Sequence, residues 1–194
     1  MKFDLYNLIV GMWIAIGVFW GILWVAGAAA GRRAARVQSG GSRLVHLVLM
    51  AAAFWLLFRK TPQLGPLDWH IVPDTPAFQY AGLIITCAGL AFTAWARAIL
   101  GRNWSAVVTI KQDHRLIRSG PYRWVRHPIY SGLLLAMLGT AIYIGQLRGF
   151  AGIGLGLAGF WMKSQLEETF LIEQFGPEYI EYKNEVKALI PTVL

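Results

Sequence analysis

Five apolar stretches alternate with polar segments along the 194 residues of the chain. The first, 8–30, contains no charged residue and has the length of a membrane-spanning helix. The second, 44–58, is shorter and is bounded by basic residues, while the third, 78–100, is interrupted only by Arg97 near its end. The last two, 129–145 and 150–162, are separated by a short connection, and the final stretch reaches the far interface only if it continues through 163–168. This pattern predicts an all-α integral membrane protein with about five transmembrane helices.

We expect a single membrane domain over 1–194. Residues 1–100 form three N-terminal spanning helices, and residues 101–194 form a polar loop, a helical hairpin and a C-terminal tail. In the tail, glutamates and apolar residues at helical spacing over 178–186 predict an amphipathic helix that lies on the membrane surface and covers the site. Gly17 and Gly21 place small residues on one helix face, where another helix is expected to approach closely.

Charge determines the expected orientation. The chain is 56% hydrophobic and only 14% charged, against about a quarter charged in soluble domains. The first loop carries four arginines and no acidic residue, and the third carries six basic residues and one acidic residue. Because basic loops remain in the cytosol, we expect the N-terminus outside, and the third loop, the active site and the C-terminus on the cytoplasmic side. The basic residues follow this rule, so nucleic-acid binding is not expected.

Two polar clusters flank the predicted hairpin and are expected to meet at the cytoplasmic face. His127 and Pro128 mark the start of the fourth helix, where unpaired N–H groups and Arg126 favour an anionic ligand. At the other end of the hairpin, Lys163 and Glu167 share a helix face, with Glu168 beside them. Ionisable side chains near lipid are functional candidates, and this acidic pair would bind a cationic group such as an amine or a sulfonium.

Several other patterns are interpreted as structural. Gly154, Gly156 and Gly159 have the spacing of a dinucleotide fingerprint, but no strand precedes them, so we expect helix packing. His114 and His127 with a glutamate lack the spacing of a metal site, and no metal is expected. His46, in an apolar run, is interpreted as a satisfied interfacial histidine rather than a ligand, and the outer-loop segment 68–70 is assigned no role.

An ordered set of motifs over roughly 101–191 resembles the isoprenylcysteine carboxyl methyltransferases and related phospholipid methyltransferases. The matching segments are Gly120-Pro121-Tyr122, Arg126-His127-Pro128-x-Tyr130-x-Gly132, Glu167-Glu168 and Phe175-Gly176-x-x-Tyr179-x-x-Tyr182. The resemblance implies S-adenosyl-L-methionine as cofactor. It implies a cofactor pocket lined by His114, Arg115, Leu116, Ile117, Tyr122, His127, Pro128, Ile129, Tyr130, Glu167 and Glu168. Lys163 stands where family members have an arginine that meets the substrate carboxylate, and with Glu167 it is the expected catalytic residue.

Methyl transfer to a carboxylate needs no general base, because this acceptor is already an anion at pH 7. It needs in-line positioning and exclusion of water. The acceptor that the resemblance implies is a lipophilic small molecule or prenylated peptide, most simply a prenylated cysteine, which we expect to enter from the membrane lipid. A phospholipid amine remains an alternative acceptor, and it would need Glu168 or His127 as a base. A small transporter or scaffold without catalytic activity is the alternative from another class.

Overall fold

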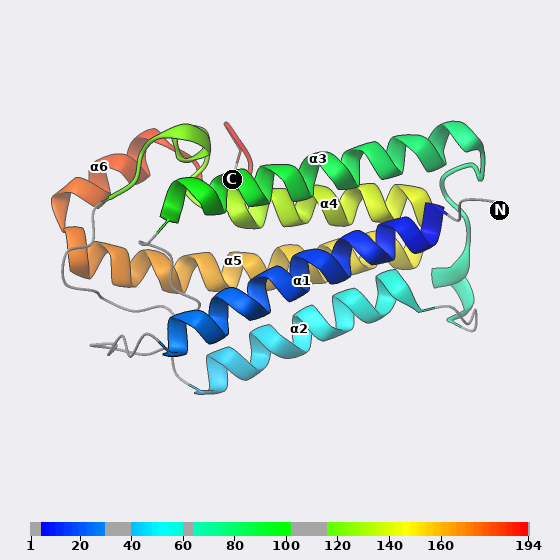
Figure 1. Ribbon diagram of the computed structural model, residues 1–194, viewed down its shortest axis with the longest axis horizontal. Helices are drawn as coiled ribbons and strands as arrows, with labels where there is room; N and C mark the ends of the chain where they lie inside the picture. Colours follow the sequence, from blue (N-terminus) through cyan, green and yellow to red (C-terminus); the bar gives the residue numbers. More distant parts are fainter. Residues whose placement is uncertain (1–4, 30–39, 60–63, 102–115, 194) are drawn as a thin grey trace.

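The protein is an elongated bundle of long helices that run side by side, with a short helix at one end (Figure 1). The computed structural model describes residues 5–29, 40–59, 64–101 and 116–193, and the backbone alone over 23–29. The helices are α1 (Leu5–Ala29), α2 (Gly40–Phe58), α3 (Pro76–Leu100), α4 (Pro128–Ile144), α5 (Leu147–Phe175) and α6 (Pro177–Glu185). Two short 3-10 turns, η1 (Gly65–Asp68) and η3 (Gly120–Arg123), complete the described elements.

Three of the described helices are long and apolar enough to cross a membrane. They are α1 over Leu5–Ile22, α2 over Gly40–Phe58 and α3 over Pro76–Leu100, which confirms three of the predicted spans. Helix α4 is apolar but has 17 residues. Helix α5 has 29 residues because, as the sequence indicated, the fifth apolar stretch continues without a break through the polar segment 163–168. That α4 and α5 complete a set of five spans stays a prediction.

Glycines allow α3 and α4 to pack with their backbones almost in contact. A Cβ atom on Gly82 would lie 2.6 Å from the Gly139 carbonyl oxygen, and one on Gly89 would lie 2.5 Å from that of Gly132. Between these contacts Thr86 Oγ1 donates to Gly82 O of its own helix at 2.9 Å and lies 3.3 Å from Ala136 O of α4. The pair therefore forms the most closely packed unit among the described helices, and it fixes where α4 begins.

Helix α5 uses glycines on two faces. On one face a Cβ on Gly152 would lie 3.0 Å from Ala53 O of α2, and one on Gly159 would lie 2.6 Å from Met50 Cε. On the other face a Cβ on Gly156 would lie 2.6 Å from Met137 Cε of α4. Gly156 and Gly159 thus have the packing role that the sequence predicted, whereas a Cβ on Gly154 would find no atom within 4 Å, so the prediction is wrong there within the described chain.

Helix α1 is fixed to the bundle through its first half. Trp13 is buried, its Nε1 donates to Thr140 Oγ1 of α4 at 3.0 Å, and its ring meets that of Phe54 of α2 edge-on at 5.1 Å. Further along α1, a Cβ on Gly17 or Gly21 would find no atom within 4 Å. The predicted close approach of another helix at these glycines is therefore wrong within the described chain, where α1 contacts the bundle through large side chains.

The end of the bundle opposite α6 is closed by a polar contact that the sequence analysis left without a role. Asp68 Oδ2 accepts from the Leu64 N–H at 2.6 Å, and Asp68 Oδ1 lies 3.6 Å from Arg148 Nε. Arg148 also donates to Leu56 O at 2.6 Å. The loop after α2 is thereby connected to the start of α5, where Gly145 ends α4 in the left-handed conformation at φ 72°.

Candidate active site

The loop before α4 and the C-terminal segment pair with each other at the end of the bundle where α3 ends and α4 begins (Figure 1). The Arg126 N–H donates to Lys187 O at 2.8 Å, and the His127 N–H donates to Ala188 O at 2.9 Å, around an isolated parallel bridge between Val125 and Lys187. These backbone contacts place Arg126 and His127 at the first turn of α4. The resulting position faces the last turns of α5, where the acidic pair lies.

Glu168 is the centre of the polar cluster and is only 1% exposed. Its Oε1 accepts from Arg126 Nε at 2.9 Å and Nη2 at 2.6 Å, and it lies 3.2 Å from His127 Nε2. Its Oε2 lies 2.7 Å from Lys183 Nζ of α6. One carboxylate therefore contacts three cationic or potentially cationic side chains, from the loop, the start of α4 and α6.

Glu167 forms a second set of contacts beside it. Its Oε1 accepts from the Tyr130 hydroxyl at 2.5 Å, and its Oε2 lies 3.4 Å from His127 Nδ1. The side chain is 23% exposed, against 1% for Glu168. Of the two carboxylates, Glu167 is therefore the one that a bound molecule can reach.

Stacked rings extend this cluster toward the middle of the bundle. The His127 and Tyr130 rings are nearly parallel, at 10° and 5.6 Å between centroids, and Tyr130 stacks on Phe160 of α5 at 16° and 4.9 Å. Lys163 Nζ lies 5.5 Å from the centroid of the Tyr130 ring, within reach of a cation–π contact. Lys163 is thus held beside the same aromatic ring whose hydroxyl group binds Glu167.

The charge of His127 is set by the two carboxylates. Burial lowers the pKa of the imidazole, but hydrogen bonds to Glu167 and Glu168 and their negative charges raise it more, so the pKa lies above its ordinary value. Both ring nitrogens face a carboxylate oxygen, which an imidazolium satisfies by donating from each nitrogen. The two carboxylates accordingly favour the imidazolium form, in which His127 connects the two glutamates.

Helix α6 and the segment after it cover this cluster. Arg126 Nη1 donates to Lys183 O at 3.1 Å and also to Val186 O. The buried Tyr182 hydroxyl donates to Tyr122 O of η3 at 2.5 Å. A helix is therefore present in the predicted tail segment, with Tyr179 and Tyr182 buried, and that it is amphipathic and lies on the membrane surface stays a prediction.

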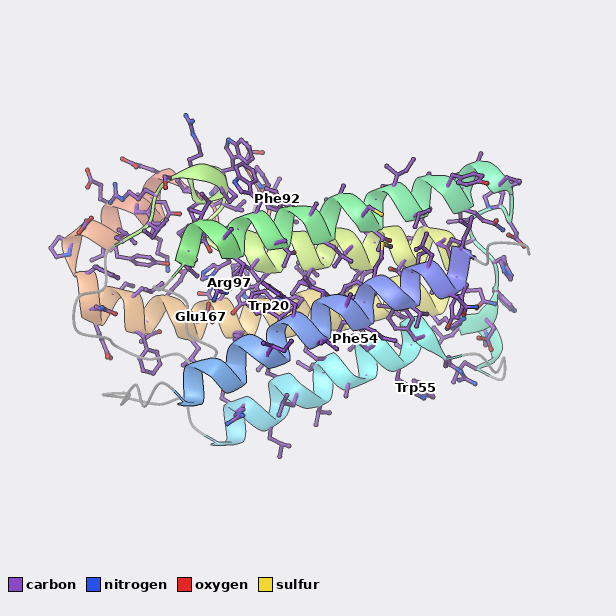
Figure 2. All side chains as sticks on the ribbon, viewed as in Figure 1. Trp20, Phe54, Trp55, Phe92, Arg97 and Glu167 are labelled. Atoms are coloured by element: carbon purple, nitrogen blue, oxygen red, sulfur yellow. The ribbon has the colours of Figure 1, made fainter. Side chains whose placement is uncertain are left out.

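Arg97 is a further cation at this end of the bundle. It belongs to the last turn of α3, and its Nη1 donates to Gly101 O at 3.0 Å. Figure 2 shows Arg97 and Glu167 at the same end of the bundle as Trp20, from α3, α5 and α1 respectively. In the sequence, Arg97 is an interruption near the end of an apolar stretch. A basic residue close to the polar end of a predicted span was the signal that would have included it.

Most of the predicted site residues lie in this region. Tyr122, His127, Pro128 and Glu168 are buried, and Ile129, Tyr130, Lys163 and Glu167 are half-buried at the facing ends of α4 and α5. Leu116 and Ile117 are half-buried and precede η3 in the loop. His114 and Arg115 lie outside the described residues. The structure thus brings together the two motifs that the sequence separates by about forty positions, as the hydrogen bond between Tyr130 and Glu167 shows.

The described chain has apolar helices of membrane-spanning length, and a cluster of arginine, histidine and paired glutamates lies at one end of them. These features define an integral membrane protein with a polar site at the rim of its bundle. The sequence profile of the isoprenylcysteine carboxyl methyltransferase (ICMT) family matches residues 82–173. This range contains the start of α4 and the acidic pair of α5.

Individual proteins agree with this match. A probable protein-S-isoprenylcysteine O-methyltransferase of Oryza sativa subsp. indica is 30% identical over 186 residues, which cover 92% of this chain and 93% of the relative. The protein-S-isoprenylcysteine O-methyltransferase of Saccharomyces cerevisiae is 32% identical over 148 residues, 66% of this chain and 58% of the relative. The solved structure of the eukaryotic intramembrane Ras methyltransferase ICMT superposes with a TM-score of 0.52 at 25% identity, over 81% of this chain and 55% of that one.

The chain belongs to the isoprenylcysteine carboxyl methyltransferase family, a family of methyltransferase enzymes. It spans little more than half of the solved relative's length.

Proposed function

We propose that this protein transfers a methyl group from S-adenosyl-L-methionine to the carboxylate of an isoprenylated cysteine at the membrane surface. The observation that supports this most is the contact network of His127, Tyr130 and Glu167, which unites the two family motifs next to Lys163. Relatives named for this reaction match nearly the whole chain, which agrees with the proposal.

The residues present fit a sulfonium-containing zwitterion. Such a cofactor has a carboxylate, an ammonium group, a ribose and a methyl group on a cationic sulfur. Glu167 combines a negative charge with partial exposure, so we assign it to the ammonium group or the ribose hydroxyls. Pro128 has no N–H, and the His127 and Tyr130 N–H groups are donated to Ala188 O and His127 O, so we assign the cofactor carboxylate to the positive dipole end of α4 and the nearby charge of Arg126 and His127 rather than to free N–H groups. When bound, the cofactor supplies an electrophilic methyl group.

Glu168 has a different proposed role from Glu167. Its two oxygens already contact Arg126, His127 and Lys183, and it is almost completely buried. We therefore assign Glu168 to holding these three side chains in position. Tyr122, Ile129 and Tyr130, with Leu116 and Ile117 of the loop, are the further residues that we assign to the cofactor pocket.

Lys163 is the proposed partner of the acceptor carboxylate. Its ammonium group lies over the Tyr130 ring and on the same helix face as Glu167, one turn earlier. A lysine provides a point charge rather than the planar fork of an arginine, so it orients one carboxylate oxygen toward the methyl group. The reaction then requires no proton transfer, and the protein contributes alignment and exclusion of water.

The contacts of His127 favour a carboxylate acceptor over an amine. Methylation of a protonated amine needs a base with a free lone pair. Both nitrogens of His127 face carboxylates, and Glu168 is engaged by cations, so neither of the two predicted bases is available in this arrangement. Amine transfer would require these contacts to break first.

We also propose that the site faces the cytosol. The ends of α1, α3 and α5 and the start of α2 and α4 lie at the same end of the bundle, next to α6 (Figure 1). The basic first and third loops connect these helix ends. By the preference of basic loops for the cytosol, the N-terminus is outside.

Calorimetric titration with S-adenosylhomocysteine tests the cofactor assignment. We expect the purified protein to bind it and Glu167→Gln to bind about 10- to 100-fold more weakly, the effect of losing one hydrogen bond to a charged group. Glu173→Gln is the matched control, because Glu173 is exposed on the same helix. Absence of binding by the native protein, or equal binding by native protein and Glu167→Gln, would contradict the assignment.

A further inference from the structure

His46 is an ionisable side chain within the membrane-spanning helix α2 that the proposed reaction does not yet use. Such residues are costly at membrane depth and usually have a function. Its interpretation as a satisfied interfacial histidine explains only one of its two nitrogens. Nδ1 lies 3.2 Å from the Gly159 carbonyl oxygen of α5.

This contact determines the tautomer of His46. A carbonyl oxygen can only accept, so Nδ1 carries the proton and donates it to Gly159 O. In the neutral imidazole, Nε2 then has the free lone pair. The side chain is half-buried, and among the described residues its hydrogen bond is the one through Nδ1. Nε2 is therefore a hydrogen-bond acceptor that is available to another molecule.

The imidazole lies next to the proposed acceptor site. Gly159 precedes Lys163 by one helical turn, and Lys163 and Glu167 are the charged groups that act on the His46 ring. The ring also contacts Phe160 at 6.1 Å between centroids, and Phe160 stacks on Tyr130. His46 is thus joined to the surroundings of Lys163 through Gly159 and through the Phe160 and Tyr130 rings.

The close approach of α2 to α5 depends on Gly159. A Cβ atom there would lie 2.6 Å from Met50 Cε and 3.5 Å from His46 Nδ1. Because glycine leaves this space to the imidazole, the Nδ1 hydrogen bond fixes the ring in position beside the acceptor site. A ring held in this way can discriminate between acceptors that place a hydrogen-bond donor opposite Nε2 and acceptors that do not.

We propose that His46 is a specificity-determining residue for the methyl acceptor, with Nε2 accepting a hydrogen bond from the amide N–H next to the acceptor carboxylate. This inference rests on the proposed function. In a C-terminal isoprenylcysteine the carboxylate and the acylated nitrogen are attached to the same carbon atom, so Lys163 meets the anion while His46 meets the N–H. The preferred acceptor is accordingly an N-acylated isoprenylcysteine, as at the end of a peptide chain. An isoprenyl thioether of a carboxylic acid that lacks the nitrogen is expected to be the poorer acceptor.

Two acceptors test this. N-acetyl-S-farnesylcysteine and S-farnesyl-3-thiopropionic acid have the same lipid and a carboxylate, but only the first has the amide. We expect the native enzyme to favour the first in kcat/KM by about three- to tenfold, the worth of one neutral hydrogen bond. His46→Asn retains a donor near the Nδ1 position and loses the group at Nε2, so we expect the ratio to fall to about one.

Further variants separate recognition from structure. His46→Gln places an amide near the Nε2 position, and we expect it to retain part of the preference. Met50→Leu is the matched control on the same face of α2, and we expect it to leave the ratio unchanged. Equal losses on both acceptors in His46→Asn, or no preference in the native enzyme, would overturn the inference and leave the proposed function intact. If the native enzyme methylates neither acceptor, the proposed function itself fails.

Discussion

Replacing Glu168 by glutamine tests whether this buried carboxylate holds the loop, α5 and the C-terminal segment together. Glutamine has nearly the same volume but removes the negative charge. Arg126, whose side chain is 7% exposed, would keep its positive charge and lose its buried counter-ion. Its contacts with Lys183 O and Val186 O would remain, but neither carbonyl group carries a compensating charge.

The contacts give the size of the effect. Breaking a buried ion pair by removing one partner costs about 3–5 kcal/mol, and the 2.6 Å contact between Arg126 and Glu168 is of this kind. The contact with Lys183 adds at most about 1 kcal/mol, because that side chain is 38% exposed and solvent weakens the attraction. We expect a loss of about 3–5 kcal/mol, or a fall of about 10 °C in the unfolding midpoint for a chain of this size.

Thermal unfolding of purified protein in detergent at pH 7, followed by circular dichroism, measures this difference. Glu167→Gln is the matched control, because Glu167 contacts Tyr130 and His127 and is 23% exposed. We expect it to lower the midpoint by a few degrees at most and to weaken cofactor binding instead. An unfolding midpoint of Glu168→Gln equal to or above that of Glu167→Gln would refute the assignment of separate roles to the two carboxylates.

Three further predictions concern stability. The pKa of His127 is raised in the folded protein, so protonated His127 stabilises the fold fully below the unfolded-state pKa of about 6.5, and this stabilisation is lost as pH rises through the folded-state pKa. Unfolding midpoints should therefore decrease as pH rises through this range, and they should decrease less in His127→Gln. The buried Tyr179 hydroxyl has no hydrogen-bond partner among the described residues, so Tyr179→Phe should raise the free energy of unfolding by about 1 kcal/mol in a denaturation assay. Tyr182→Phe removes the hydrogen bond to Tyr122 O and should lower the free energy of unfolding by about as much. Gly132→Ala would place a Cβ 2.3 Å from a threonine Oγ1, so it should lower the free energy of unfolding by about 1–3 kcal/mol. Gly154→Ala would place a Cβ with no atom within 4 Å, so it should leave thermal stability unchanged or slightly higher.

The sequence was sufficient to predict the helices and the two parts of the site. Long uncharged stretches at membrane length indicate spans on their own, and three of them are confirmed. The pairing of 120–132 with 163–168 could be predicted because a hairpin of two apolar helices returns the chain to the same side. The contact between Tyr130 and Glu167 agrees with that reasoning.

The packing glycines could be predicted only in part from the sequence, which indicated Gly156 and Gly159 but not the glycines of α3 and α4. Gly17 and Gly21 have the spacing of a helix-contact motif, yet the close contacts occur at Gly82, Gly89 and Gly132. Small residues at helical spacing permit close packing, but which helix lies opposite depends on the tertiary arrangement. The spacing alone therefore does not distinguish a face that meets a helix from one that does not.

The division of roles between the two glutamates was equally hidden. Glu167 and Glu168 are neighbours in sequence. Their side chains point to different partners because successive residues of a helix lie on different faces. Only the structure shows that one meets Tyr130 while the other meets Arg126 and Lys183. The Asp68–Arg148 contact at the opposite end was missed for a different reason, because its partners lie far apart in sequence.

The central claim is that the site at the rim of the bundle methylates a carboxylate. Its most direct test is to incubate the purified protein with S-adenosyl-L-methionine labelled on the methyl group and with N-acetyl-S-farnesylcysteine, and to treat the product with base. We expect a labelled methyl ester that releases methanol on hydrolysis and that forms more slowly with Glu167→Gln at the same limiting cofactor concentration. A product stable to base, or no labelled product under conditions where the protein binds S-adenosylhomocysteine, would contradict it.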